Sequence, residues 1–227
     1  MKVAAVAVPV LAGIARANPV EVEARQSCPS VHVFGARETT APPGYGTSQG
    51  LVNMVLQAYP GATSEAIDYP ACGGQWSCGG VDYDSSAYQG TQAVVSAVTS
   101  FNQRCPDTKI VLIGYSQGGQ IMDNAYCGGA GATLSGNALN AVKAAIFLGD
   151  PHYVSGLPFN VGTCQAGGFA ARPPGYQCSP GNANNIKSYC DAEDPYCCNG
   201  WDANHHQQYV NIYGQQALSF IRSKLDS

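Results

Sequence analysis

The sequence predicts an α/β fold in which a five-stranded parallel sheet is covered by helices on both faces. Five apolar runs have the length of strands, at residues 31–34, 65–69, 110–114, 144–148 and 186–189. Four longer stretches with helical periodicity lie between and after them, at residues 48–59, 85–103, 119–126 and 207–225. Continuous apolar strands joined by helical crossovers are typical of a parallel sheet that is buried on both faces.

The first strand and the first helix each contain a residue that resembles a functional one. His32 lies inside the strand at 31–34, so we interpret it as a histidine of the strand or core. The helix at 48–59 begins within Gly46-Thr47-Ser48-Gln49-Gly50, which fits the pattern G-x-S-x-G. That pentapeptide follows the turn-rich segment APPGYG and no strand, so Ser48 is interpreted as part of a helix start.

The third strand leads into the most informative segment, KIVLIGYSQGGQ at residues 109–120. Here the apolar run breaks at Gly114-Tyr115-Ser116-Gln117-Gly118 and a helical stretch follows at once. A strand, a sharp turn and a helix around G-x-S-x-G form a nucleophile elbow, which lifts the serine hydroxyl above the sheet. Both glycines are required because a side chain at either position would block the tight approach of the backbone. Ser116 is therefore the predicted nucleophile, and the motif predicts an acid and then a histidine later in the chain.

The last helix shows an apolar stripe with a period near 3.6 residues and two basic side chains in its final turn. The stripe consists of Val210, Ile212, Tyr213, Leu218, Ile221 and Leu225. Five strands make a small sheet for a hydrolase, so we expect no large inserted cap over the site. Ligands of open parallel sheets bind beyond the carboxyl ends of the strands, which is where Ser116 lies.

The general base is expected from the loop before this last helix. The chain order of this fold class is serine, acid, histidine, and His205 and His206 occupy that loop. Chain order alone does not choose between them. His152, which follows Asp150-Pro151 at a strand end, is the rival base.

The acid has two candidates, Asp150 and Asp194. Asp150 ends the strand expected beside the nucleophile strand, whereas Asp194 follows the next strand and lies nearer the loop that carries the histidine. A local disulfide in the segment DAEDPYCC would also hold Asp194 in place, which favours it. The alternative for either residue is an aspartate that caps a turn ahead of proline.

Residues 1–17 are predicted to be a signal peptide. Lys2 precedes an apolar run at 3–14 that is too short to span a bilayer, and small residues follow it. Residues 18–26 then resemble a short pro-segment, and residues 27–227 are long enough for one catalytic domain with a full core. The protein is therefore expected to be secreted, and no other stretch has the length and hydropathy of a membrane span.

Composition excludes one class of partner. Without Lys2, Arg16, Arg25, Glu21 and Glu23 of the leader, the 11 basic and 15 acidic side chains become 8 and 13, a formal charge of −5. A weakly acidic chain with no basic cluster argues against nucleic acid as a partner. The many uncharged polar residues suit an uncharged polar substrate.

All ten cysteines lie beyond the leader, so five disulfides are the expected arrangement in an exported chain. Cys72 and Cys78 are expected to close a small loop, and spacing does not pair the others. The alternative is a metal site, because Cys197-Cys198 precedes the two histidines. Adjacent cysteines in exported proteins more often enter two different bridges, so we predict no metal.

Five segments together resemble the cutinase-like acetylxylan esterases (carbohydrate esterase family 5). They are SCPSVHVFGARETT, DYPACGG, VLIGYSQGGQIMD, AAIFLGDP and SYCDAEDPYCCNG. The resemblance runs from about Ser27 to the C-terminus. It implies a small α/β-hydrolase fold and a secreted serine carboxylic ester hydrolase that removes acetyl groups from acetylated xylan.

The resemblance also implies roles for single residues. Ser116 is the nucleophile, Asp194 the acid and His206 the base, while His205 replaces the family's threonine and is the fallback base. The oxyanion hole takes one donor from the backbone N–H of Gln117, as elbow geometry requires, and by resemblance a second from Thr39. An acyl-serine mechanism needs no cofactor.

Substrate choice is expected to rest on Tyr196, between the acid and Cys197. Cutinases of this family carry a small aliphatic residue there, so a tyrosine implies an acyl site that accepts little more than acetate; the alternative is a tyrosine that packs beside a disulfide. We expect Trp201, Asn199 and Tyr115 to form a shallow polar surface for the sugar. Alternatives are a cutinase that hydrolyses longer-chain esters and, in another class, an inactive carbohydrate-binding protein. A monomer is the expected state.

Overall fold

The computed structural model describes residues 1–2 and 27–227. The predicted signal peptide at 1–17, apart from its first two residues, and the predicted pro-segment at 18–26 lie outside the described residues. In the described part of the chain, no helix combines the length and hydropathy needed to cross a bilayer.

The described residues form one parallel sheet with the strand order β2-β1-β3-β4-β6-β5. The strands are β1 Val31–Ala36, β2 Thr63–Ala66, β3 Lys109–Tyr115, β4 Val142–Leu148, β5 Asn160–Val161 and β6 Ile186–Tyr189. The predicted parallel sheet is confirmed, with six strands in place of five. The added strand, β5, is only two residues long and pairs with the end of β6, so it leaves no apolar run in the sequence.

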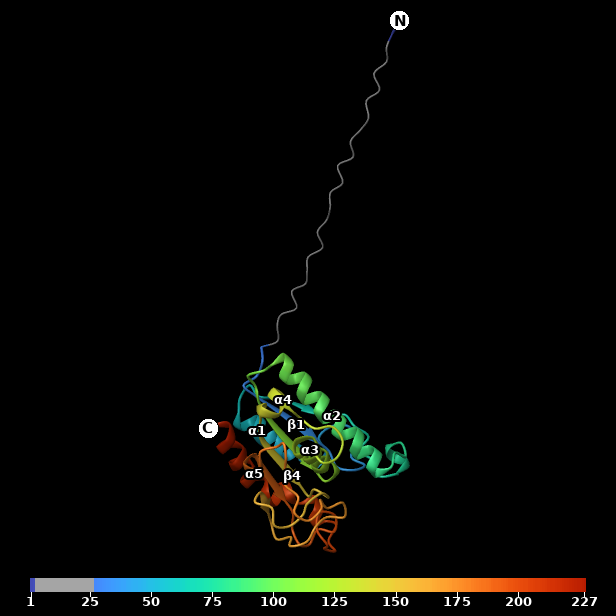
Figure 1. The fold of residues 1–227 in the computed structure, drawn as a ribbon, viewed down its shortest axis with the longest axis vertical. Helices are drawn as coiled ribbons and strands as arrows, with labels where there is room; N and C mark the ends of the chain where they lie inside the picture. The colour runs from blue at the N-terminus through green and yellow to red at the C-terminus, as the bar shows by residue number, and fades with distance from the viewer. Residues whose placement is uncertain (3–26) are drawn as a thin grey trace.

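Helices cover both faces of the sheet, as predicted (Figure 1). The helices are α1 Gln49–Ala58, α2 Tyr83–Arg104, α3 Gln117–Cys127, α4 Gly136–Ala141 and α5 Tyr209–Leu225. One buried cluster joins the sheet to α2, α3 and α4, and a second joins it to α1 and α5. Alternate residues of β3 enter the two clusters: Leu112 faces α3, whereas Tyr115 faces α5.

All ten cysteines are paired, which confirms the expected five disulfides. They are Cys28–Cys105, Cys72–Cys78, Cys127–Cys178, Cys164–Cys198 and Cys190–Cys197. The small loop closed by Cys72 and Cys78 was predicted, and Cys197 and Cys198 do enter different bridges. These two bridges place three sulfur atoms within 4.8 Å of one another, but each is already bonded to sulfur.

Candidate active site

Ser116 lies on the turn between β3 and α3, with φ 54° and ψ −121°. A positive φ at a residue other than glycine is a strained conformation that surrounding structure must hold in place. Its N–H donates to the carbonyl of Leu148, 2.8 Å away on β4. A Cβ at Gly114 would come within 2.2 Å of the Gly118 carbonyl oxygen, and one at Gly118 within 2.3 Å of the Ala36 carbonyl oxygen. The turn is therefore the nucleophile elbow that the sequence predicts, and it needs both glycines.

Ser48, the serine of the other G-x-S-x-G pentapeptide, is fully buried. It lies where the chain enters α1, and its hydroxyl donates to the Tyr45 carbonyl at 2.6 Å. The interpretation as part of a helix start is confirmed.

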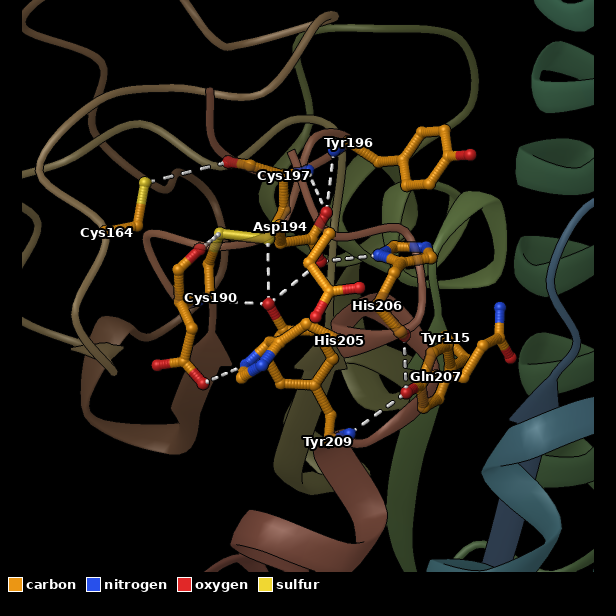
Figure 2. Close-up of polar contacts among 12 residues, drawn as sticks. Tyr115, Cys164, Cys190, Asp194, Tyr196, Cys197, His205, His206, Gln207 and Tyr209 are labelled. Carbon is orange, nitrogen blue, oxygen red and sulfur yellow. Dashed lines mark hydrogen bonds and ion pairs between the residues drawn. A yellow bond between two sulfur atoms is a disulfide. The ribbon is translucent and has the colours of Figure 1, made fainter. Parts of the chain in front are cut away.

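His206 lies in a short helical turn directly before α5, and its ring contacts the predicted acid. Nδ1 of His206 is 2.5 Å from Oδ2 of Asp194 (Figure 2). A carboxylate only accepts hydrogen bonds, so Nδ1 carries the proton and Nε2 is left as an acceptor. His206 and Ser116 line the same pocket, which has a volume of about 590 Å³.

Asp194 is fully buried and is held by four donors. Oδ1 accepts from the N–H groups of Tyr196 and Cys197, at 2.6 and 3.2 Å. Oδ2 accepts from His206 and, at 2.8 Å, from the hydroxyl of Tyr209. Burial alone would raise the pKa of Asp194, but its hydrogen bonds, and the positive charge of the His206 ring when that ring is protonated, hold this pKa below its ordinary value. The carboxylate therefore stays ionised beside the imidazole.

The rival acid and bases lie elsewhere. Asp150 lines a separate small cavity together with His152, whose backbone N–H it accepts at 2.8 Å. Burial and the nearby charge of Asp123 raise the pKa of Asp150 well above its ordinary value. His205 points to a different carboxylate, with Nε2 2.8 Å from Oδ2 of Asp191 (Figure 2). His32 packs in the core as interpreted, with its ring stacked 3.9 Å from that of Phe101.

One candidate oxyanion donor is fixed by its own side chain. Gln117 begins α3, where the first N–H groups have no partner within the helix. Its buried side chain accepts from the Ser86 hydroxyl at 2.8 Å and donates to the Cys72 carbonyl at 2.9 Å. These two bonds hold the backbone of the residue that follows Ser116.

The second candidate, Thr39, lines the same pocket as Ser116. A buried arginine shapes its loop. The guanidinium of Arg37 donates from Nε to the Ala41 carbonyl at 3.0 Å and from Nη1 to the Ile67 carbonyl at 3.3 Å. This arginine ties both ends of the loop to the segment after β2. The sequence had placed the second strand at 65–69, but its pairing ends at Ala66 because the following carbonyls turn to Arg37.

The residues predicted to contact substrate fall in three different places. Tyr196 is 41% exposed, lines the pocket, and has its ring centre 4.6 Å from that of His206. Trp201 and Asn199 are exposed on the loop that follows the acid. The assignment of Tyr115 to the sugar surface is wrong, because this side chain is fully buried. Its hydroxyl donates to the His206 carbonyl at 2.8 Å and accepts from the Tyr209 N–H at 3.1 Å, so it supports the site from beneath.

Several residues at the site were not found from the sequence, and three of them are aromatic. Tyr209 donates to Asp194. It lies three residues after His206 near the start of a helix, and this spacing could have indicated that the two side chains lie close together. Tyr83 and Phe169 line the pocket and pack edge to face, with ring centres 5.2 Å apart. They come from α2 and a long loop, and no motif marks them.

A model of the Cutinase family matches residues 27–225. Among curated proteins, the chain is 62% identical to Cutinase 11 of Verticillium dahliae, in an alignment that covers 89% of this chain and 71% of that protein. It is 61% identical to Acetylxylan esterase 2 of Talaromyces purpureogenus, with 93% of this chain and 94% of that protein covered. Among solved structures, an acetylxylan esterase determined at 0.90 Å matches with a TM-score of 0.85 and 62% identity, over 88% of this chain and 100% of the other. The similarity therefore includes every element that lines the pocket.

Proposed function

The chain belongs to the cutinase family and is a carboxylic ester hydrolase, and from these premises we propose that it removes acetyl groups from acetylated xylan. The catalytic residues in this proposal are Ser116, His206 and Asp194. The observation that carries it is the buried His206–Asp194 pair, whose histidine lines one pocket with a serine on a strained turn. That arrangement is the one needed to activate a serine hydroxyl.

The reaction runs in two halves through an acetyl-serine. In the first, the Ser116 hydroxyl attacks the ester carbonyl while Nε2 of His206 takes its proton, and the ionised Asp194 stabilises the imidazolium. The oxyanion accepts hydrogen bonds from the Gln117 N–H and from Thr39. The tetrahedral intermediate then expels the sugar oxygen, which receives the proton from His206.

Water completes the cycle by the same route. It gives a proton to His206 as its oxygen bonds to the acetyl carbon, and collapse of the second intermediate releases acetate and restores the Ser116 hydroxyl. The five disulfides fit an oxidising compartment, so the protein acts outside the cell. The proposal takes the protein as a monomer, in which one chain supplies Ser116, His206 and Asp194.

The choice of acetate over longer acyl groups rests on Tyr196. Its ring centre lies 4.6 Å from that of His206, and the residue lines the pocket together with Ser116. One observation favours the second candidate, a cutinase: a relative called Cutinase 11 is as similar to this chain as the acetylxylan esterases are. The two activities differ in the space for the acyl group, which a tyrosine at position 196 would fill and a small aliphatic residue would leave open.

The test compares hydrolysis of p-nitrophenyl acetate, butyrate and octanoate. We expect kcat/KM to fall steeply with acyl length in the parent enzyme, and Tyr196→Ala to raise the octanoate-to-acetate ratio. Tyr196→Phe is the matched control, since it keeps the ring and should keep the parent ratio. Release of acetate from acetylated xylan, without release of fatty acids from cutin, completes the expected result. Equal rates on acetate and octanoate would favour the second candidate activity, hydrolysis of longer-chain esters.

A further inference from the structure

Exposed aromatic side chains gather around the catalytic pocket. In residues 27–227, five aromatic side chains are exposed: Trp76, Tyr88, Phe169, Tyr196 and Trp201. Phe169 and Tyr196 line the pocket itself. Trp76 follows the pocket residue Gln75, and Trp201 lies two residues before the pocket residue Ala203. Single exposed apolar side chains are ordinary on protein surfaces, but here two of the five line the pocket and two more lie within two residues of a pocket residue in the sequence, which indicates a binding surface.

The two tryptophans are the extreme cases, with exposed fractions of 95% for Trp76 and 97% for Trp201. Rings so exposed add little to the stability of the fold. We propose that Trp76 and Trp201 are stacking platforms that bind xylose units of the polysaccharide beyond the acetylated one. This inference rests on the proposed function and extends it from the reacting ester to the polymer.

The loop of Trp76 is held rigidly to the nucleophile. The Cys72–Cys78 disulfide closes it, and the Gly80 N–H donates to the Gln75 carbonyl at 2.9 Å. The Cys72 carbonyl accepts from the side chain of Gln117, the residue after Ser116. A platform on such a loop needs little ordering when a ligand binds, which favours affinity.

The loop of Trp201 is tied in the same way to the acid. The N–H of Gly200 donates to the Asp194 carbonyl at 3.0 Å, and that of Asp202 to the Glu193 carbonyl at 2.9 Å. Both tryptophans therefore project into solvent from backbone that is fixed relative to the catalytic residues. A polymer bound on them would present its acetyl group in a defined place.

The surroundings of the two rings favour a carbohydrate over an apolar polyester. The exposed neighbours are polar, with Gln75 and Ser77 on either side of Trp76 and Asp202 next to Trp201. A sugar offers a flat C–H face that stacks on indole and hydroxyl groups that need hydrogen-bond partners. A polyester or lipid surface would instead be met by a continuous apolar patch.

The first test compares polymer with small ester in Trp76→Ala and Trp201→Ala. For each variant we expect the ratio of kcat/KM on acetylated xylan to kcat/KM on p-nitrophenyl acetate to fall roughly tenfold, mainly through KM. Tyr88→Ala removes an exposed aromatic ring on α2 that has no pocket residue within two positions in the sequence, so this variant should keep the parent ratio. An unchanged ratio in both tryptophan variants would refute the role of these residues as platforms, and it would leave the proposed esterase activity unaffected. Absence of acetate release from acetylated xylan by the parent protein would refute the proposed function instead.

The second test uses the fact that these are the two tryptophans of the chain, so they supply all its tryptophan fluorescence. In a Ser116→Ala background, Trp76→Phe and Trp201→Phe each leave one reporter. Titration with unacetylated xylohexaose should shift the emission of each to shorter wavelength. Three results would each overturn the proposal. They are no change in the emission of either reporter, a shift of the emission with lipid vesicles in place of the sugar, and a dimer in sedimentation that forms only when the tryptophans are present.

Discussion

Asp194 and Asp150 are two buried aspartates whose surroundings move their pKa values in opposite directions. Asp194 accepts four hydrogen bonds, which outweigh burial and lower its pKa. Asp150 accepts one backbone N–H, and burial and the charge of Asp123 raise its pKa. Only a carboxylate that stays ionised can fix the tautomer of an imidazole and stabilise its charged form. This difference supports the choice of Asp194 as the acid.

Asp194→Asn should therefore reduce kcat by about 10⁴-fold, because an amide permits the wrong tautomer of His206. Asp150→Asn is the matched control: it exchanges one buried carboxyl group for an amide in a different cavity and should keep most of the parent kcat. Both are checked by steady-state hydrolysis of p-nitrophenyl acetate, with circular dichroism to establish folding. A large loss in Asp150→Asn with little in Asp194→Asn would reverse the assignment.

Single functional residues can be predicted from the sequence where a local pattern marks them. The glycines around Ser116 and the position of His206 before the last helix are such patterns. Tyr115 was misplaced because its neighbour Ser116 lines the pocket, whereas the alternation of the strand turns Tyr115 toward α5. The pairing of His205 with Asp191 joins positions 14 residues apart across a loop, and no periodicity predicts it.

At the scale of elements, the turn between β3 and α3 determines the position of the nucleophile. Its geometry depends on two close backbone approaches, Gly114 to Gly118 and Gly118 to the end of β1. The second approach links the turn to the strand whose loop carries Thr39. The elbow and the oxyanion loop are therefore packed as one unit.

Gly118→Ala should destabilise the protein by about 3 kcal/mol or more, because the new methyl group meets backbone atoms that cannot move aside. Gly214→Ala in α5 is the control, since its Cβ would meet the flexible end of Met54 at 3.3 Å and Val210 Cγ1 at an ordinary contact distance of 3.6 Å. Alanine is favoured over glycine inside helices, so that variant should gain up to about 1 kcal/mol. Urea denaturation measures both. Equal stability of the two variants would show that the turn is not close-packed.

The long elements were predictable and the short ones were not. The strand at 186–189 was predicted with the bounds that β6 has, and α1, α2, α3 and α5 agree to within about two residues at most ends. β5 and α4 are two and six residues long, too short for a period to develop. The second strand was shifted because Ile67 and Tyr69 are buried although they lie beyond Ala66, the last residue of β2, and apolar character indicates burial rather than strand pairing.

At the scale of the whole molecule, the carboxyl and amino ends of the strands differ in function. Ser116, Thr39 and Tyr196 line the pocket at the carboxyl ends of the strands. The amino end of β1 carries His32, which is buried against Phe101 and hydrogen-bonded to Thr63 at 2.6 Å. Burial, with a smaller contribution from the charge of Arg104, lowers the pKa of His32 from 6.5 to about 4.

This shift predicts a pH dependence of stability that is separate from activity. The folded protein keeps His32 neutral, whereas the unfolded chain binds a proton below pH 6.5. Because only the unfolded chain binds this proton, the free energy of unfolding falls as the pH drops from 6.5 to about 4. The total loss is roughly 3 kcal/mol.

Urea denaturation of the parent and of His32→Gln between pH 7 and pH 4 measures this contribution. The parent should lose more unfolding free energy than the variant as the pH falls. Parallel curves for the two proteins would show that His32 does not carry the effect.

The most direct test of the central claim is covalent labelling by diethyl p-nitrophenyl phosphate followed by peptide mass spectrometry. An activated serine hydroxyl displaces p-nitrophenolate from this reagent, so we expect one diethylphosphoryl group per chain, on Ser116, with esterase activity lost in proportion. Ser116→Ala and denatured protein should remain unlabelled. A folded and active protein that takes no label at Ser116, or that loses activity through a label elsewhere, would contradict the account.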